Sequence, residues 1–280
     1  MKHDRMRKYR AELGYTLVEV MVAITIAVFL LAGLFTILQQ TRKTSNETSG
    51  ISQLQDDERV AMSILTDVIQ QAGYVPEANG SGASLFAADT VFGYGGQVIA
   101  GGSGAAVGDK IIVRNVLATN DTTLDCLGET NTGGEKVFAA VIDIETNTKT
   151  GVNQLMCSPY DTAPPQSLVN NVVNLTFQYA VNTTSASSST ASNATGPNSE
   201  ATGATGYGCP ADAYIPTASM SATDWTNVCA VKVDLTFVNP LYQPAGQPQP
   251  TPGQPQYVTF ERVIGVLSKT GVNVTKVTQT

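Results

Sequence analysis

Four cysteines are the residues whose chemistry is easiest to assign in this 280-residue chain. They are Cys126, Cys157, Cys209 and Cys229, and neither a CxxC pair nor a neighbouring histidine accompanies them. Structural zinc sites combine such pairs with histidines, so the pattern favours disulfides over a metal site. Four cysteines permit three pairings. We favour Cys126–Cys157 with Cys209–Cys229, because each of these pairs closes a modest loop between predicted strand ends.

Side chains suited to catalysis are scarce. The only histidine is His3, so the chain beyond its first residues has none for a catalytic triad or a histidine metal site. The adjacent acids Asp56 and Asp57 fall on a predicted helix face, where solvated charge is the simpler interpretation. The glycine-rich segment Gly93–Gly108 lacks the GxxxxGKS or GxxxxGKT pattern of a phosphate-binding loop. We therefore expect no enzyme activity and no cofactor.

Acidic residues outnumber basic ones, and the formal net charge is −7. An acidic surface disfavours non-specific binding of nucleic acid, which depends on Lys and Arg at the phosphates. Three of the acids, Asp121, Asp125 and Glu129, are close in sequence, and carboxylates are ligands for calcium. Their spacing is not that of an EF-hand loop, so we predict neither a metal site nor a nucleic-acid partner.

A single charged residue, Glu19, interrupts the otherwise apolar or small run from Tyr15 to Leu38. About 20 apolar residues suffice for a helix to cross the hydrocarbon core of a membrane, and a spanning segment must be helical to satisfy its backbone. A carboxylate inside such a run is costly, so we expect Glu19 to have a function. The alternative is a plain membrane anchor with Glu19 in the headgroup region.

The segment before this run, Met1–Gly14, contains five Lys/Arg residues and only two acids. Such a basic leader should stay in the cytoplasm and send the following chain outward, where disulfides persist. No small-residue cleavage site of the secretory kind follows the apolar run. The only marked junction is the one between Gly14 and Tyr15.

At this junction the chain resembles the type IV pilin-like proteins: Gly14 ends a basic leader, and an aromatic residue, apolar and hydroxyl residues and Glu19 follow. The resemblance implies cleavage after Gly14 by a prepilin peptidase and methylation of the new amine on Tyr15. Tyrosine is a mild departure, since the family more often has phenylalanine there. The resemblance also implies that Glu19 neutralises the N-terminal amine of a neighbouring subunit in the assembled filament.

Periodicity indicates a second helical stretch, Ile51–Tyr74, with an apolar stripe and a charged face. We expect one long helix from about Tyr15 to Ala72, although two helices joined by the polar segment Thr41–Gly50 fit the same pattern. The predicted domains are a leader (1–14), a membrane or filament-core helix (15–40), an amphipathic helix that continues into the head (41–74) and a β-rich head (75–280).

The head is predicted to consist mainly of strands. Residues Asn79–Gly108 read mostly as loop, with a short strand near Val91–Ile99, and the low-complexity segment Asn182–Gly208 and the Pro-rich segment Pro240–Gln256 read as long loops. Predicted strands are Lys110–Leu117, Val137–Glu145, Val152–Cys157 (the hairpin partner of Val137–Glu145), Leu168–Val181, Val228–Val238 and Tyr257–Ser268. A long helix followed by strands predicts an α+β, type IV pilin-like fold, with the helix packed on an antiparallel sheet.

The head resembles the PilW group of minor pilins. The likeness lies in ILTDVIQQAGY at the end of the helix, then GDKIIVRN, LDCLG and LMCS, LVNNVVNLTFQYAV, and WTNVCAVKVDLTFV. LDCLG and LMCS contain Cys126 and Cys157, and the resemblance places these two cysteines opposite each other. Cys209, Cys229 and the two long loops are interpreted as specific to this protein.

The resemblance implies a low-abundance subunit that joins other minor pilins at the filament tip and primes pilus assembly. The implied partners are the prepilin peptidase, the other minor pilins, the major pilin, the inner-membrane assembly platform and a tip adhesin. The protein would sit in the bacterial inner membrane with its head in the periplasm, and then in the pilus at the cell surface. Two alternatives remain: a J-type minor pseudopilin of type II secretion, and a tip adhesin or DNA-uptake subunit.

Overall fold

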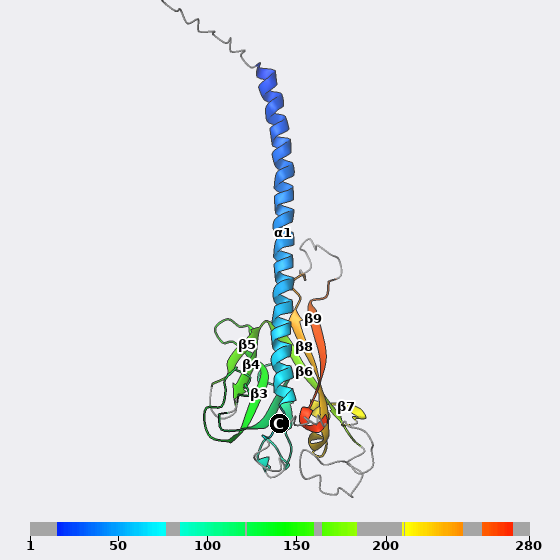
Figure 1. The fold of residues 1–280 in the computed structure, drawn as a ribbon. Coiled ribbons are helices and arrows are strands. Elements are labelled where there is room, and N and C mark those ends of the chain that lie inside the picture. The colour runs from blue at the N-terminus through cyan, green and yellow to red at the C-terminus, as the bar shows by residue number, and fades with distance from the viewer. Residues whose placement is uncertain are drawn as a thin grey trace, which may run out of the picture. The chain divides into compact units, whose positions relative to one another are not determined.

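The computed structural model describes residues 16–76, 85–120, 122–159, 164–183, 209, 211–242 and 254–270 (Figure 1). The chain divides into two compact units, residues 1–50 and 51–280, which are described separately. The predicted cleavage junction, Gly14–Tyr15, and most of the two predicted long loops lie outside the described residues.

One helix, α1 (Leu17–Gln70), runs through both predicted helical stretches. The prediction of a single long helix is therefore confirmed, and the alternative of two helices joined by a linker is wrong. Within the polar segment, the Thr44 and Thr48 hydroxyl groups donate to backbone carbonyl oxygens four residues earlier, so these polar side chains are compatible with the helix. Gly73, with a φ of 73°, ends the helical turn in the left-handed conformation that glycine tolerates.

The head has two antiparallel sheets rather than the one that we predicted. The first has the order β1-β2-β3-β4-β5 and the second β7-β6-β8-β9. The strands of the first sheet are β1 (Ile99–Ser103), β2 (Asp109–Leu117), β3 (Lys136–Thr146), β4 (Asn153–Pro159) and β5 (Gln166–Asn170). Those of the second are β6 (Val172–Val181), β7 (Ala213–Pro216), β8 (Val228–Val238) and β9 (Tyr257–Gly265). Short helical turns η3 (Thr217–Ser219), η4 (Asp224–Asn227) and α3 (Leu267–Thr270) complete the head.

The division into two sheets occurs inside a segment that we predicted as one strand, Leu168–Val181. Asn171 has a φ of 62°, a left-handed conformation that asparagine adopts more readily than most residues. This single residue ends β5 and starts β6, so that the two halves of the segment join different sheets.

Strand β1 was missed, because its sequence is rich in glycine and we predicted mostly loop there. It pairs with β2 from Ile99 opposite Val113 to Ser103 opposite Asp109. Gly101 is required by packing: a Cβ atom there would lie 2.8 Å from Cη2 of Trp225, which makes an edge-to-face contact with the ring of Tyr179. The other differences are smaller: β9 ends at Gly265 and α3 follows it, whereas the strand was predicted to reach Ser268.

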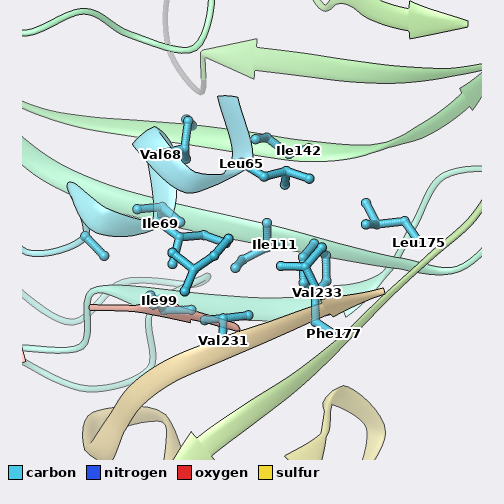
Figure 2. Packing of buried hydrophobic residues seen from close by; sticks show 14 of the residues in the cluster. Leu65, Val68, Ile69, Ile99, Ile111, Ile142, Leu175, Phe177, Val231 and Val233 are labelled. Carbon is cyan, nitrogen blue, oxygen red and sulfur yellow. The ribbon is translucent and has the colours of Figure 1, made fainter. Parts of the chain in front are cut away.

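The hydrophobic core lies between the end of α1 and the two sheets (Figure 2). Leu65 and Ile69 of α1 are fully buried, with Ile142 from the first sheet and Leu175 and Val233 from the second. Each such side chain contributes roughly 1.5–3 kcal/mol on burial. The strand periods predicted this packing, since β6 and β8 alternate buried and partly exposed residues over most of their lengths.

The β3–β4 hairpin was predicted correctly, with Thr146 opposite Asn153. The side-chain oxygen of Asn147 accepts hydrogen bonds from the backbone N–H groups of Lys149 and Thr150 and so fixes the turn. In the second sheet β8 has the predicted bounds, and Val238 lies opposite Tyr257 where the Pro-rich segment connects β8 to β9.

Candidate assembly surfaces: the apolar helix and the stapled head

The first half of α1 exposes its apolar side chains all round. Every residue from Leu17 to Leu38 is exposed, including large hydrophobic ones such as Phe29, Leu31 and Phe35. This part of α1 is long and apolar enough to cross a membrane. A helix that is apolar on every side must be buried elsewhere, so this segment has the length and composition of a membrane anchor and is equally suited to packing against other helices of its kind.

Glu19 is the only charged residue in this exposed apolar segment, and it lies in the first turn of α1. Its backbone N–H donates to the Thr16 Oγ1 atom over 3.3 Å and to the Thr16 carbonyl oxygen over 3.1 Å. Thr16 therefore caps the helix, and a carboxylate in the first turn is favourable to the helix dipole. The predicted partner of Glu19 is the Tyr15 amine of a neighbouring subunit, and in this chain Gly14 and Tyr15 lie outside the described residues.

Hydroxyl groups within the apolar segment are satisfied inside the helix. Thr25 donates to the carbonyl oxygen of Val22 over 2.8 Å, and Thr36 donates to that of Ala32 over 3.0 Å. Because lipid provides no hydrogen-bond partners, these internal bonds allow threonine in a segment that leaves water.

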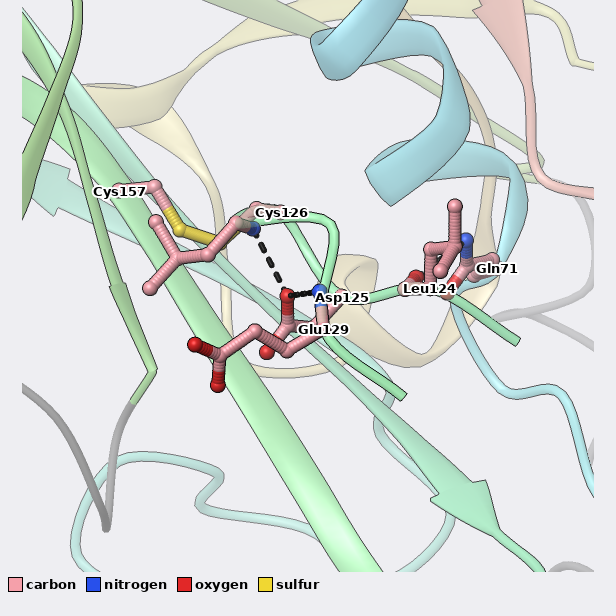
Figure 3. The surroundings of a disulfide bond; sticks show 7 residues. Gln71, Leu124, Asp125, Cys126, Glu129 and Cys157 are labelled. Atoms are coloured by element: carbon pink, nitrogen blue, oxygen red, sulfur yellow. Dashed lines mark hydrogen bonds between the residues drawn. A yellow bond between two sulfur atoms is a disulfide. The ribbon is translucent and has the colours of Figure 1, made fainter. Parts of the chain in front are cut away.

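The first disulfide, Cys126–Cys157, fastens a tight loop to β4 beside the end of α1 (Figure 3). In this loop one carboxylate oxygen of Asp125 accepts hydrogen bonds from the backbone N–H groups of Leu127 and Glu129, over 2.8 and 2.9 Å. The Gln71 side-chain amide donates to the carbonyl oxygen of Leu124, which ties the same loop to α1. These bonds fix the conformation of the loop, and the Asp125 carboxylate stabilises its turn.

The second disulfide, Cys209–Cys229, joins the end of the low-complexity segment to β8. Next to it, Thr183 donates from its backbone N–H and its hydroxyl to the two carboxylate oxygens of Asp212, over 2.9 and 2.7 Å. Thr183 and Cys209, the described residues on either side of 184–208, are thus held by Asp212 and by Cys229 of β8. The two disulfides are the pairs that the loop lengths favoured, with Cα–Cα distances of 6.2 and 5.4 Å.

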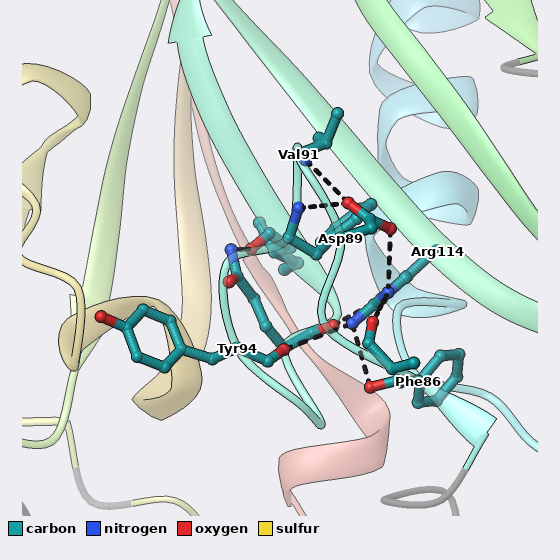
Figure 4. A network of polar contacts seen from close by, with 9 residues as sticks. Phe86, Asp89, Val91, Tyr94 and Arg114 are labelled. Carbon is teal, nitrogen blue, oxygen red and sulfur yellow. Dashed lines mark hydrogen bonds and ion pairs between the residues drawn. The ribbon is translucent and has the colours of Figure 1, made fainter.

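A buried arginine, Arg114 of β2, holds segment 85–97 against the outer face of the first sheet (Figure 4). Its guanidinium donates to four carbonyl oxygens and contacts the rings of Phe86 and Phe92, at 5.3 and 4.1 Å from the ring centroids. The four acceptors belong to Phe86, Ala87, Tyr94 and Gln97. We predicted no role for this residue, although a lone arginine among the apolar residues of KIIVRNVL was the available signal.

Asp89 completes this network with a 3.5 Å ion pair to Arg114. One of its oxygens also accepts from the backbone N–H groups of Val91 and Phe92, both over 2.7 Å. The hydrogen bond from Phe92 is the main cause that lowers the pKa of Asp89, with smaller contributions from Val91 and Arg114. Burial acts the other way on Asp143 of β3, where it raises the pKa despite a backbone hydrogen bond from Ala105 and the charge of Lys110.

Within the part of the chain that the structure describes, no group of three or more His, Cys, Asp or Glu side chains is arranged to hold a metal ion. Of the three acids considered for calcium, Asp125 is engaged in its turn and Asp121 lies outside the described residues.

Two family models match the chain. Residues 9–35 match the prokaryotic N-terminal methylation motif, a range that contains Gly14, Tyr15 and Glu19. Residues 142–265 match type IV pilus-assembly protein W, PilW, over most of the head's strands. Neither a curated protein nor a solved structure matches the chain.

With its exposed apolar helix and antiparallel head, the chain is similar to the type IV pilin-like proteins, in agreement with both matches. Over the head the similarity is to the PilW family, whose model extends from β3 to the end of β9. The description of that family is one of pilus-assembly proteins.

Proposed function

We propose that this protein is a minor pilin of a type IV pilus, in the complex of minor pilins that primes assembly and sits at the filament tip. The observation that carries the proposal is the apolar half of α1: its side chains are exposed all round, and its only charge is Glu19 in the first turn. A segment of this kind can leave the membrane only for another apolar environment, such as the helical core of a filament.

Processing would come first. Cleavage by a prepilin peptidase between Gly14 and Tyr15 removes the basic leader, and methylation of Tyr15 follows. The match to the N-terminal methylation motif supports both steps. The new amine would stand at the start of α1, where Glu19 of a neighbouring subunit neutralises it. Such a buried pair persists because a lone charge in an apolar core is far more costly than a paired one.

The head would present the specific contacts. Two long connections in the sequence, residues 182–208 between β6 and β7 and residues 240–256 between β8 and β9, join neighbouring strands of the second sheet. Repeated lateral packing along a shaft leaves little room for such connections, so they suit a subunit at the tip. The proposed partners are the other minor pilins, the major pilin, the assembly platform of the inner membrane and a tip adhesin.

Mass spectrometry of filaments sheared from the native cell tests this proposal. We expect a methylated N-terminal peptide that begins at Tyr15, in trace amount relative to the major subunit. A peptide that keeps residues 1–14, or a protein abundant in the inner membrane and absent from filaments, would contradict it. Loss of protein secretion with unchanged surface filaments, after deletion of the gene, would favour the pseudopilin alternative.

A further inference from the structure

Strand β9 forms an edge of the second sheet, and its outer side has no partner within the part of the chain that the structure describes. It pairs with β8 over its whole length, from Tyr257 opposite Val238 to Gly265 opposite Ala230. Among the described residues, no backbone hydrogen bond from another segment reaches β9. An edge of nine residues presents a row of N–H and C=O groups that an extended chain can pair with.

The hydrogen bonds at the two ends of the β8–β9 pair show which backbone groups point outward. The N–H of Asn239 donates to Gln256, and the N–H of Val266 donates to Cys229. Hydrogen-bonded and non-hydrogen-bonded pairs alternate along an antiparallel ladder. Counting from either end of the β8–β9 pair gives the same set of hydrogen-bonded residues. The residues whose N–H and C=O groups face away from β8 are therefore Tyr257, Thr259, Glu261, Val263 and Gly265.

The other sheet edges are less suited to pairing. Strand β7 is four residues long and ends in Pro216, which has no N–H to donate. Strand β1 is five residues long, and Thr217 and Trp225 of η3 and η4 pack closely on its Gly101. Strand β5 has five residues, little more than half the length of β9. Of the described edges, β9 offers the longest uninterrupted row.

The side chains of β9 specify what can dock there. Tyr257 and Val263 are 45% and 50% exposed, on the same face of the strand, and Phe260 lies partly buried on the other. Glu261 is paired with Lys232, whereas Arg262 is exposed and belongs to neither of the two ion pairs found among the described residues. A complementary strand would therefore carry apolar side chains and a carboxylate opposite Arg262.

We infer that the outer edge of β9 binds an extended strand of a different pilin subunit, with an acidic side chain facing Arg262, so that the second sheet continues from one subunit into the next. This inference rests on the proposed function, because it is the filament complex that supplies the partner. Main-chain hydrogen bonds to alternate residues of β9 provide the affinity, and the side chains on its two faces provide the choice of partner.

A backbone substitution separates docking from folding. The Val263→Pro variant removes an N–H that points away from β8, so the β8–β9 ladder stays intact and the head should fold. Val263→Thr is the matched control, since it keeps the N–H and a β-branched side chain. Arg262→Glu is a second variant that reverses the charge and leaves the backbone unchanged. Equal protein level and formation of both disulfides would establish that each variant folds.

The readout is photocrosslinking of the full-length protein in its native cells, with a photoreactive phenylalanine analogue in place of Tyr257. A control probe replaces Tyr214, which is exposed on β7. We expect a discrete adduct with another pilin from the probe at position 257 and none of that mass from position 214. Val263→Pro and Arg262→Glu should each lower the adduct yield about tenfold, the effect of a change near 1.4 kcal/mol in affinity, and Val263→Thr should not.

An adduct whose yield neither variant changes, an adduct with a second copy of this chain, or no adduct at all would each overturn the inference. These results can be distinguished from a failure of the proposed minor-pilin function. A trace of processed protein in sheared filaments would uphold the minor-pilin role even if β9 proved unpaired. A β9-dependent adduct with a protein other than a pilin would refute the identity of the partner, and the sheared-filament measurement would decide the minor-pilin role independently.

Discussion

Removal of the Arg114 side chain should destabilise the head far more than a typical substitution. Arg114 is 3% exposed and donates from Nε to the carbonyl oxygen of Gln97 over 2.6 Å and from Nη1 to that of Ala87 over 2.8 Å. Two further bonds, to Phe86 and Tyr94, are longer, at 3.3 and 3.5 Å. The Arg114→Ala variant removes this donor from the carbonyl oxygens of Gln97 and Ala87, whereas those of Phe86 and Tyr94 still accept from the backbone N–H groups of Gly96 and Gln97.

The cost can be worked out from these contacts. Each of the two short bonds involves a charged donor and contributes about 1.5–3 kcal/mol, which gives roughly 3–6 kcal/mol for Arg114→Ala before the lost ring contacts are counted. The variant Arg114→Lys should fall between Ala and the natural residue. Lysine keeps the charge but lacks the planar fork that reaches several carbonyl oxygens at once.

The ion pair with Asp89 contributes little to this cost. The Asp89 side chain is 53% exposed and lies 3.5 Å from Arg114, a geometry typical of pairs that contribute about 0–1 kcal/mol. Asp89→Asn keeps an oxygen that can accept from Val91 and Phe92, so its loss should stay below about 1 kcal/mol.

Urea unfolding of the full chain in detergent, followed by fluorescence of Trp225, measures these differences. Trp225 is the only tryptophan and lies 4.7 Å from the ring of Tyr179 in the core, so its emission reports the folded head. Arg59→Ala, an exposed arginine on α1, should change the free energy of unfolding by no more than about 0.5 kcal/mol. The reasoning is refuted if Arg114→Ala costs no more than this control, or if Asp89→Asn costs as much as Arg114→Ala.

Three further predictions concern the head. Replacing Cys126 and Cys157 by serine should lower the free energy of unfolding by about 3–4 kcal/mol, from the loop entropy of a 31-residue separation, and the same urea titration would show an unchanged midpoint if the bond contributes nothing. Gly101→Ala should cost about 1–3 kcal/mol by overpacking against Trp225, and a melting temperature equal to that of the natural protein would contradict the packing. Asp143→Asn should stabilise the head at pH 7, because burial raises the pKa of Asp143 and ionisation in the folded state is therefore costly. As the pH falls through that raised pKa the natural protein regains this free energy, so the advantage of the variant should shrink towards pH 4, and an advantage that grows on acidification would show the sign to be wrong.

How far the sequence predicts this structure depends on whether the information is local. Strand β8 was predicted with its observed bounds, because its buried residues alternate without interruption from Val231 to Phe237. Helix α1 was predicted from the length of its apolar run and from the stripe that follows. In these elements the side-chain period alone decides the structure.

Where contacts between residues far apart in the sequence determine the local structure, the sequence pattern did not predict it. Strand β1 contains Gly101, whose lack of a side chain is explained only by Tyr179 and Trp225, far away in the sequence. The break at Asn171 depends on strand pairing, because the two halves of this continuous β-prone segment pair in different sheets. The role of Arg114 depends on carbonyl groups that segment 85–97 brings to it.

The two halves of α1 differ in the burial of their apolar side chains. From Leu54 onward its buried and partly buried residues lie in the core of the head, whereas none of the exposed apolar residues from Leu17 to Leu38 contributes to that core. The first half is apolar on every side, which no single docking face in the head could satisfy. Because the two hydrophobic surfaces do not overlap, a change at Glu19 can alter the contacts of the helix without cost to the folded head. The core of the head, conversely, can be weakened at Leu65 without changing the exposed apolar segment.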